Sequence, residues 1–316
     1  MRALFFGTPS IAVPALSALH EIAEVAGVVC QPDRPAGRGM ELRAPPVKLR
    51  AEELGIPVIQ PEKIRTPDFA AWVRSANADV ALVMAYGRIL PPAVLAAPRR
   101  GCLNLHASLL PRYRGAAPIT WSIVRGETET GISLMQMDEG CDTGPVFTMH
   151  KIPIGEDMTA DELAVELAKL GASVVREDLV RVVEGALVAE PQDSAQATMA
   201  PLLKKEDGRI AWGQSSRIVH NHIRGMTSWP GAFTSAEGKL LKVLASKVAK
   251  DAFDPNKNEK NASPGTVIAA GKHGIEVACG DGSIFVMRAQ AEGRKPLLAA
   301  DLVAGRTLRE GMVLGN

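Results

Sequence analysis

The sequence has few cysteines, none of them paired at metal-binding or redox spacing, and no long apolar run. Because no C-x-x-C pair occurs, neither a zinc site nor a disulfide framework is expected. The four cysteines are predicted to be small apolar fillers kept reduced: Cys30, Cys102, Cys141 and Cys279. No stretch approaches the roughly 18–20 apolar residues that a membrane span requires. A cytoplasmic protein without a membrane segment is therefore predicted.

A dinucleotide-binding fingerprint and a strong net charge are also missing. The first apolar run ends in Gly7-Thr-Pro-Ser10 without the G-x-G-x-x-G pattern, so dinucleotide binding is not expected. The net charge of +1 divides unevenly, because residues 204–316 carry 17 basic against 11 acidic side chains and residues 1–203 carry 19 against 24. A basic C-terminal part suits an anionic polymer held away from a reaction centre, although a solvated surface would give the same count.

Short apolar runs alternate with helical patterns through the first half of the 316 residues, a length that allows two domains. The predicted strands are 2–7, 25–30, 57–60, 80–85, 102–105 and 132–137, and the predicted helices are 11–22, 46–54, 69–75 and 159–184. Thr159 and Glu162 are spaced for a capping box. This alternation predicts an α/β fold with a Rossmann-like, mainly parallel sheet and helices on both faces, over residues 1–189.

The pattern changes after residue 189. Residues 190–206 are polar and aperiodic, which predicts a linker. The next part carries a predicted helix at 215–224 and short alternating runs at 240–248, 265–268, 274–279 and 283–288. Such runs separated by turn residues predict a small C-terminal β-barrel over 207–316. The lysine- and asparagine-rich stretch 250–264 predicts a mobile loop inside it.

One group of polar residues carries recognisable chemistry. Residues 104–111 spell Asn-Leu-His-Ala-Ser-Leu-Leu-Pro, and Asp142 follows in an Asp-x-Gly sequence. If residues 101–106 form a strand, Asn104 and His106 share one face. An amide, an imidazole and a carboxylate can stabilise an oxyanion and move a proton without a metal or a covalent nucleophile. The residues alone leave open that His106 and Asp142 are structural, or that Cys141 is a nucleophile paired with His106.

The stretch 104–118, together with 85–91 and 130–144, resembles the formyltransferases that use 10-formyltetrahydrofolate as formyl donor. This resemblance implies that Asn104, His106 and Asp142 form a catalytic triad. It also implies that the folate is held by a turn and by a pterin-recognising segment, made of Ser108, Leu109, Leu110, Pro111 and of Tyr86, Gly87, Ile89, Leu90. No metal is implied, and His220 and His222 are predicted to be structural because residues two apart on a helix diverge.

The acceptor is indicated by residues 31–39, which are similar to a basic loop in family members that formylate methionyl initiator tRNA. In this loop Arg34 and Arg38 would contact the tRNA, since arginine pairs with phosphates and stacks on unpaired bases. The resemblance then implies formyl transfer to the α-amine of methionyl initiator tRNA in translation initiation. It further implies a C-terminal barrel of oligonucleotide-binding type, and we expect a monomer.

Two other functions stay open at this point. An amino-sugar (sugar-nucleotide) N-formyltransferase would share the triad and can share the barrel, but would not need residues 35–39. A non-catalytic tRNA-binding protein on an enzyme scaffold would bind RNA without using the folate.

Overall fold

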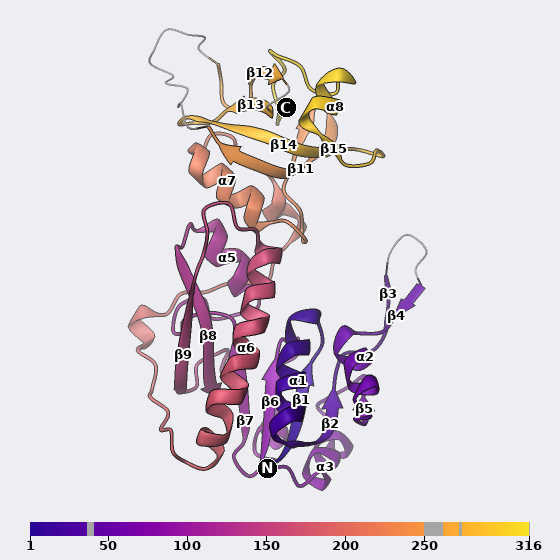
Figure 1. Ribbon diagram of the computed structural model, residues 1–316, viewed down its shortest axis with the longest axis vertical. Coiled ribbons are helices and arrows are strands. Elements are labelled where there is room, and N and C mark those ends of the chain that lie inside the picture. Colours follow the sequence, from indigo (N-terminus) through magenta and orange to yellow (C-terminus); the bar gives the residue numbers. More distant parts are fainter. Residues whose placement is uncertain (37–40, 250–261, 272–273, 316) are drawn as a thin grey trace. The chain divides into compact units, whose positions relative to one another are not determined.

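The computed structural model describes residues 1–36, 41–249, 262–271 and 274–315. The chain forms two compact units, each made of several segments. Unit 1 comprises Met1–Pro118, Glu129–Pro153 and Ala164–Pro201, and unit 2 comprises Ile119–Thr128, Ile154–Leu163 and Leu202–Asn316. The chain thus passes from unit 1 into unit 2 after residues 118 and 153 and returns each time. It enters unit 2 for the last time after residue 201 (Figure 1). A functional division at 190–206 stays a prediction.

Unit 1 is built on a seven-stranded sheet with the order β5-β2-β1-β6-β7-β8-β9. Its strands are β1 (Arg2–Gly7), β2 (Glu24–Val29), β5 (Val58–Ile59), β6 (Val80–Met84), β7 (Cys102–His106), β8 (Glu129–Gln136) and β9 (Val146–Pro153). The pairs from β5 to β7 are parallel, and β8 and β9 are antiparallel to their neighbours. The predicted Rossmann-like, mainly parallel sheet is confirmed.

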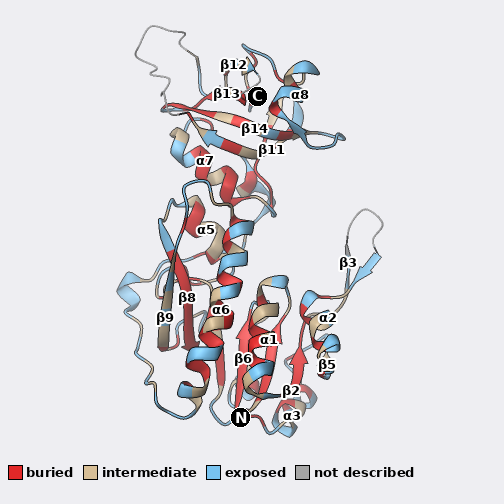
Figure 2. Cartoon of the chain, in the orientation of Figure 1, coloured by how far each residue is buried: buried red, intermediate tan, exposed pale blue. Residues whose placement is uncertain are grey.

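Helices cover both faces of this sheet, as predicted. They are η1 (Ser10–Ala12), α1 (Val13–Ile22), α2 (Pro46–Glu53), α3 (Pro67–Ser75), α4 (Pro92–Leu95) and α6 (Ala160–Val183). On one face Phe6 of β1 packs against Phe69 of α3, with the two rings edge to face. On the other face Met84 and Leu105 lie against α6 at Gly171, where the missing side chain lets helix and sheet approach closely. Buried residues accordingly run along the strands (Figure 2).

The predicted capping box of α6 is confirmed. The backbone N–H of Thr159 donates to Glu162 Oε2 at 2.8 Å, and the backbone N–H of Glu162 donates to Thr159 Oγ1 at 3.3 Å. Two donors that the helix start leaves without intrahelical partners are satisfied in this way. No helix of the described residues is both long and apolar enough to cross a membrane.

Unit 2 contains an antiparallel sheet with the order β10-β11-β14-β13-β12, and β15 pairs with β14. The elements are α5 (Pro118–Val124), η3 (Lys205–Gly208), α7 (Ser216–Gly225), β10 (Phe233–Ala236), β11 (Lys239–Val248), β12 (Val267–Gly271), β13 (Gly274–Ala278), β14 (Ser283–Ala291), β15 (Leu297–Leu298) and α8 (Ala299–Ala304). The C-terminal segment bridges both edges of this sheet, because Leu314 pairs with Ala236 and Val313 pairs with Thr266. The expected barrel is therefore an antiparallel sheet that its own C-terminal residues close.

Several features differ from the sequence-based prediction, which did not include α4, α5, α8, β10 and β15. β9 was not predicted, and neither was the hairpin of β3 (Arg34–Ala36) and β4 (Glu41–Arg43). The predicted linker contains the short helix η2 (Ser194–Gln196), and Glu190 pairs with Val146 of β9, so its first part is tied to unit 1 by backbone hydrogen bonds. Most of the predicted loop 250–264 lies outside the described residues.

Candidate active site

Asn104 and His106 lie at the carboxyl end of β7, where ligands of such sheets gather. β7 pairs with β6 only as far as Asn104, whereas its pairing with β8 continues to His106. The edge of β7 that faces β6 is thus free of strand pairing beyond Asn104. Asn104 is half-buried and His106 is 5% exposed, so both side chains are held by the fold.

Asp142 joins these two residues through one carboxylate oxygen. Its Oδ1 lies 3.5 Å from Nδ2 of Asn104 and 3.5 Å from Nδ1 of His106. The other oxygen, Oδ2, accepts a hydrogen bond from the backbone N–H of Gly115 at 2.8 Å. The structure therefore brings the three predicted triad residues together. Distances of 3.5 Å are long, as is common in active sites before substrates bind.

The hydrogen bonds of His106 determine which ring nitrogen is available for chemistry. Nε2 lies 2.9 Å from the carbonyl oxygen of Tyr113. A carbonyl oxygen only accepts, so Nε2 carries the proton of this hydrogen bond. Nδ1 is then the nitrogen that faces Asp142.

The loop that supplies the Gly115 amide requires glycine at that position. Gly115 has φ +120°, and a Cβ atom there would lie 2.6 Å from the carbonyl oxygen of Ala200. The backbone of Arg114 donates to Thr198 O at 2.8 Å, and that of Ala117 donates to Ala200 O at 3.2 Å. Residues 198–200 therefore flank the loop 114–117 and fix its approach to Asp142.

The turn that follows β7 is locked by side-chain hydrogen bonds. Ser108 Oγ donates to the carbonyl oxygen of Arg112 at 2.7 Å, and Ser133 Oγ donates to Ser108 O at 2.7 Å. Leu110 N donates to Ser133 Oγ at 3.1 Å. Ser108 and Leu110 are buried, while Leu109 and Pro111 are half-buried. Within the turn predicted to hold folate, Leu109 and Pro111 thus present the accessible surface, and Ser108 and Leu110 set its shape.

The second segment predicted to hold folate begins with a buried tyrosine. Tyr86 is 2% exposed, its ring packs edge to face on Phe6, and burial raises the pKa of its hydroxyl to about 12. The carbonyl oxygen of Tyr86 accepts from Thr8 Oγ1 at 3.1 Å and from Gln31 Nε2 at 3.2 Å. Gly87 follows with φ +83°. Tyr86 therefore anchors the segment through its ring and its backbone.

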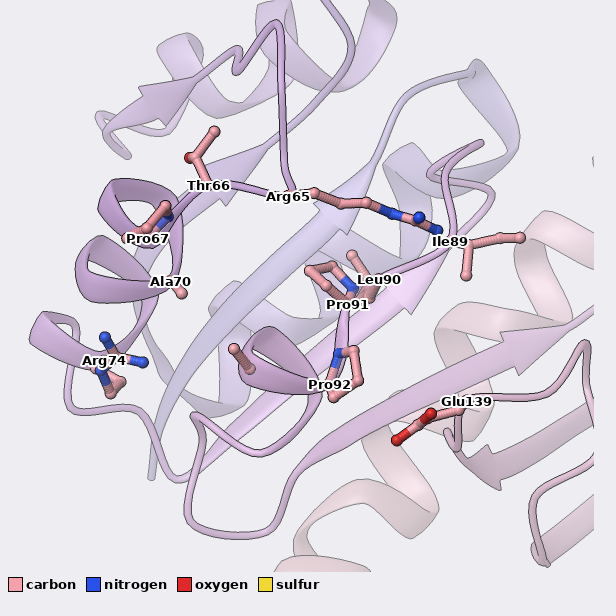
Figure 3. A pocket seen from close by; sticks show the side chains of 11 residues that line it. Arg65, Thr66, Pro67, Ala70, Arg74, Ile89, Leu90, Pro91, Pro92 and Glu139 are labelled. Carbon is pink, nitrogen blue, oxygen red and sulfur yellow. The ribbon is translucent and has the colours of Figure 1, made fainter.

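Ile89 and Leu90 of the same segment line a cavity of about 620 Å³ in unit 1. Its wall is mainly apolar, with two arginines and one glutamate, and consists of Arg65, Thr66, Pro67, Ala70, Arg74, Ile89, Leu90, Pro91, Pro92, Ala93 and Glu139 (Figure 3). Ile89 is 66% exposed and Leu90 is 2% exposed. Glu139 and Asp142 both belong to the loop 137–145 between β8 and β9, called the Asp142 loop below. This loop therefore also borders the cavity. No sequence motif had singled out Arg65 or Arg74.

Arg34, predicted to contact tRNA, is exposed on β3 and pairs in register with Arg43 of β4. Leu42 of the same hairpin is 72% exposed. At the foot of the hairpin Asp33 forms an ion pair with Lys48 at 2.8 Å and accepts from Gln60 at 2.6 Å. Arg38 lies outside the described residues.

The sequence analysis did not identify Gln192. It included Arg114 in the stretch 104–118 without giving this residue a role. Nε and Nη2 of Arg114 donate to Oε1 of Gln192 at 3.1 and 2.8 Å. Gln192 lies in the predicted linker, where no periodicity or motif marks it. Its contacts are visible only once the chain is folded.

The two histidines of α7 differ in exposure, because His220 is buried and His222 is half-buried. His220 Nδ1 lies 3.0 Å from Ser246 Oγ, and its Nε2 lies 3.2 Å from the carbonyl oxygen of Glu156. Burial lowers the pKa of His220 and of His222, which favours neutral rings at neutral pH. Within the described residues, no group of three or more His, Cys, Asp and Glu side chains is arranged to hold a metal ion.

Comparisons with known proteins identify the family of the chain. Residues 1–179 match the family model described as "Formyl transferase", and residues 202–307 match "Formyl transferase, C-terminal domain". The methionyl-tRNA formyltransferase of Sorangium cellulosum is 70% identical over all 316 residues, covering 100% of both chains. That of Geobacter metallireducens is 49% identical over 314 residues, covering 99% of this chain and 98% of the relative.

A solved structure shows that the fold extends beyond close relatives. A sugar 3N-formyl transferase, crystallised in the presence of dTDP and 5-N-formyl-THF, matches with a TM-score of 0.67 and 18% identity. The match covers 93% of this chain and 99% of the other. Identity this low supports the fold alone. The identity to the methionyl-tRNA formyltransferases is far higher, and it does not favour the amino-sugar alternative. The chain belongs to the formyl transferase family and, within it, to the methionyl-tRNA formyltransferases.

Proposed function

We propose that this chain transfers the formyl group of 10-formyltetrahydrofolate to the α-amine of methionyl initiator tRNA, in the cytoplasm and as a monomer. The observation that carries the proposal is the position of Asp142 Oδ1, 3.5 Å from both the Asn104 amide and the His106 imidazole. Three groups of different chemistry then surround one point at the carboxyl end of β7.

Each group has a distinct part in this reaction. When the amine attacks the formyl carbon, negative charge develops on the formyl oxygen, and the Asn104 N–H is the neutral donor placed to stabilise it. His106 Nδ1 exchanges a proton at the reacting atoms, because Nε2 stays bound to Tyr113. Asp142 orients the imidazole and stabilises positive charge on the ring as it forms.

Proton balance fits this arrangement without a covalent intermediate on the protein. The attacking ammonium group must lose two protons to become the N–H of the formamide, and the departing folate nitrogen must gain one of them. A single His–Asp pair can accept one proton and pass it to the leaving nitrogen, and the other proton is released to water. Neither a metal nor a thiol is needed for this step.

The 620 Å³ cavity supports a folate donor. Folates combine flat rings with carboxylates, and the cavity combines the apolar surface of Ile89 and Leu90 with the cations of Arg65 and Arg74. Its border with the Asp142 loop would place a bound ring system beside the residues that act on the formyl group. Leu109 and Pro111, the accessible residues of the other predicted folate-binding segment, complete the proposed donor site.

The tRNA is proposed to contact both units. Arg34 is exposed on β3, and Arg38 belongs to the same stretch. Residues 204–316 carry 17 basic against 11 acidic side chains, a surplus of positive charge that would attract the phosphate backbone. Such contacts weaken with salt, so the KM for tRNA should rise steeply with ionic strength.

Transfer of labelled formyl from 10-formyltetrahydrofolate tests the proposal directly. Charged initiator methionyl-tRNA, charged elongator methionyl-tRNA and an amino-sugar nucleotide would be compared as acceptors. Labelling of the initiator tRNA alone is the expected result. Labelling of the sugar nucleotide in preference to either tRNA would replace the proposed acceptor, and labelling of none would refute the activity.

A further inference from the structure

Gln192 contacts the Asp142 loop with one end of its amide and Arg114 with the other. Its Nε2 donates to the carbonyl oxygen of Asp142 at 2.9 Å and to that of Gly144 at 2.7 Å. Its Oε1 accepts from Nε and Nη2 of Arg114. The reverse orientation would set an oxygen against two carbonyls and an NH₂ group against a cation, so the contacts fix the orientation of the amide.

The Asp142 loop needs such support because its backbone is in an unfavourable conformation. Asp142 has φ +55°, in the left-handed region that residues with a side chain rarely adopt. The two hydrogen bonds from Gln192 bracket this residue and Gly144. They therefore hold the backbone that carries the Asp142 carboxylate, while the carboxylate itself faces Asn104 and His106.

Arg114 extends the same support to the other side of Asp142. It is 7% exposed and directly precedes Gly115, whose N–H donates to Asp142 Oδ2. The Gln192 side chain thus connects the backbone of residues 142–144 to Arg114, and the next residue, Gly115, donates to the Asp142 carboxylate. Backbone, carboxylate and amide donor are fixed in one hydrogen-bonded frame.

We propose that Gln192 is a positioning residue for formyl transfer. By binding the carbonyl oxygens of Asp142 and Gly144 and the side chain of Arg114, it holds Asp142 Oδ1 in position next to Asn104 and His106. The inference rests on the proposed function, since it gives Asp142 its part in the reaction. The segment predicted as a linker then contributes to the active site. An error of about 1 Å in the position of a catalytic group can lower a rate by roughly 100-fold.

The substitution Gln192→Glu tests the contacts of the amide nitrogen separately from those of the amide oxygen. It preserves size and the oxygen that accepts from Arg114, but replaces the donor to Asp142 and Gly144 by a second oxygen. Gln192→Ala removes both ends. Gln196→Glu is the matched control, because Gln196 lies in the same segment, is exposed, and donates only to Asp193 at 2.8 Å among its described contacts.

We expect Gln192→Glu and Gln192→Ala to lower kcat about 10- to 100-fold, with the KM for folate and for tRNA changed by less than about threefold. The pH dependence of kcat should shift in both, since the His106–Asp142 geometry changes. Gln196→Glu should behave as the unsubstituted chain. Wild-type kcat and pH profile in Gln192→Glu, or an equal loss in Gln196→Glu, would overturn the proposal.

Amide hydrogen exchange at residues 141–144 gives a second readout that needs no activity. Faster exchange in Gln192→Glu than in Gln196→Glu is expected if the two donors hold the loop. Unchanged exchange would overturn the positioning role even if kcat fell, because the loss would then have another origin. If the unsubstituted chain transferred no formyl group to any acceptor, the proposed function would fail, while exchange would still decide whether Gln192 holds the loop.

Discussion

Nε2 of His106 lies 2.9 Å from the carbonyl oxygen of Tyr113, on the opposite side of the ring from Asp142. This contact fixes the tautomer, since the carbonyl oxygen can only accept. It also fixes the ring plane, because Tyr113 is itself held by a hydrogen bond from its backbone N–H to Thr198 Oγ1 at 2.9 Å. Nδ1 is therefore the nitrogen that faces Asp142.

Replacing His106 should abolish most of the turnover without unfolding the protein. His106→Ala removes the proton-transferring group, and general acid–base catalysis contributes typically about 10²–10⁴-fold. We expect kcat for formyl transfer to fall by that factor while equilibrium binding of tRNA is retained. Steady-state kinetics with both substrates saturating, and a filter-binding titration of tRNA, measure the two quantities.

His150 provides a matched control for this substitution. It also contacts an aspartate, with Nε2 2.7 Å from Oδ2 of Asp178, whose side chain is 4% exposed. His150→Ala should lower the free energy of unfolding by roughly 1–3 kcal/mol, because the buried carboxylate loses a hydrogen-bond partner. Its kcat should stay within twofold. A kcat for His106→Ala within tenfold of the unsubstituted chain would remove His106 from the proposed chemistry.

Gly115→Ala should damage both stability and turnover. The new Cβ would meet the carbonyl oxygen of Ala200, so the loop must move and take the Gly115 amide away from Asp142. Gly185→Ala is the control, because Gly185 has φ +79° but no atom within 4 Å of the position that a Cβ would take. Gly185→Ala should cost about 1 kcal/mol for its backbone conformation alone. Gly115→Ala should cost roughly 1–3 kcal/mol more.

Urea unfolding and kcat, measured on both glycine variants, check this expectation. The kcat of Gly115→Ala should fall at least tenfold, and that of Gly185→Ala should not change. Equal losses of stability in the two variants would mean that the contact with Ala200 relaxes without cost. An unchanged kcat in Gly115→Ala would show that the amide is not needed by Asp142.

The sheet of unit 1 could be predicted because its central strands are continuous apolar runs. Every residue of β6 is buried, and such a run has few alternatives in a globular protein. β9 was missed because most of its positions are at least partly accessible, with Thr148, His150 and Lys151 among them. An edge strand of this kind has no pattern that separates it from a loop. Its pairing with β8 determines its structure.

The proximity of Asn104, His106 and Asp142 could be predicted from the sequence, but the contacts of Gln192 with the loop of Asp142 could not. Asn104 and His106 stand two apart on a predictable strand, so their common face follows from period two. Gln192 lies far along the chain in a polar stretch, and its partners Asp142, Gly144 and Arg114 come from two other loops. Nothing local marks a glutamine whose function depends on contacts between loops. Such residues appear only when the backbone hydrogen bonds are known.

Removing the hydroxyl of Tyr86 should leave activity unchanged and should not destabilise the protein. The hydroxyl is buried and has no hydrogen-bond partner among the described residues. Tyr86→Phe removes this desolvated group and keeps the ring that packs on Phe6. Tyr86→Ala would instead cost about 3–5 kcal/mol through the cavity it leaves.

Thermal unfolding and the KM for folate measure the effect of Tyr86→Phe. An unchanged or slightly raised Tm with an unchanged KM is expected, since Tyr86 is 2% exposed and its hydroxyl would not face the pterin ring. A KM raised more than about fivefold, at an unchanged Tm, would show that the hydroxyl itself contacts the donor.

Cys141 should be alkylated slowly at neutral pH, and removing the charge of Asp142 should accelerate the reaction. Its Sγ lies 3.7 Å from Asp142 Oδ2. Burial and the neighbouring carboxylate both raise the pKa of the Cys141 thiol, against a smaller lowering by Arg114. Since the thiolate is the nucleophile, a raised pKa also argues against Cys141 as a catalytic nucleophile.

The sign of the effect follows from these causes. In the unsubstituted chain the alkylation rate should rise with pH and approach its plateau only above the ordinary thiol range. Asp142→Asn removes the charge that opposes thiolate formation, so its rate–pH curve should lie at lower pH and its rate at neutral pH should be higher.

Iodoacetamide labelling followed by mass spectrometry measures both curves, and Cys141→Ser gives the background. The other three thiols should contribute little, because burial raises the pKa to about 11 for Cys30 and about 12 for Cys102 and Cys279. Superimposable curves for the unsubstituted chain and Asp142→Asn would mean that the carboxylate does not act on the thiol, and would place the Asp142 side chain elsewhere than beside Cys141 in solution.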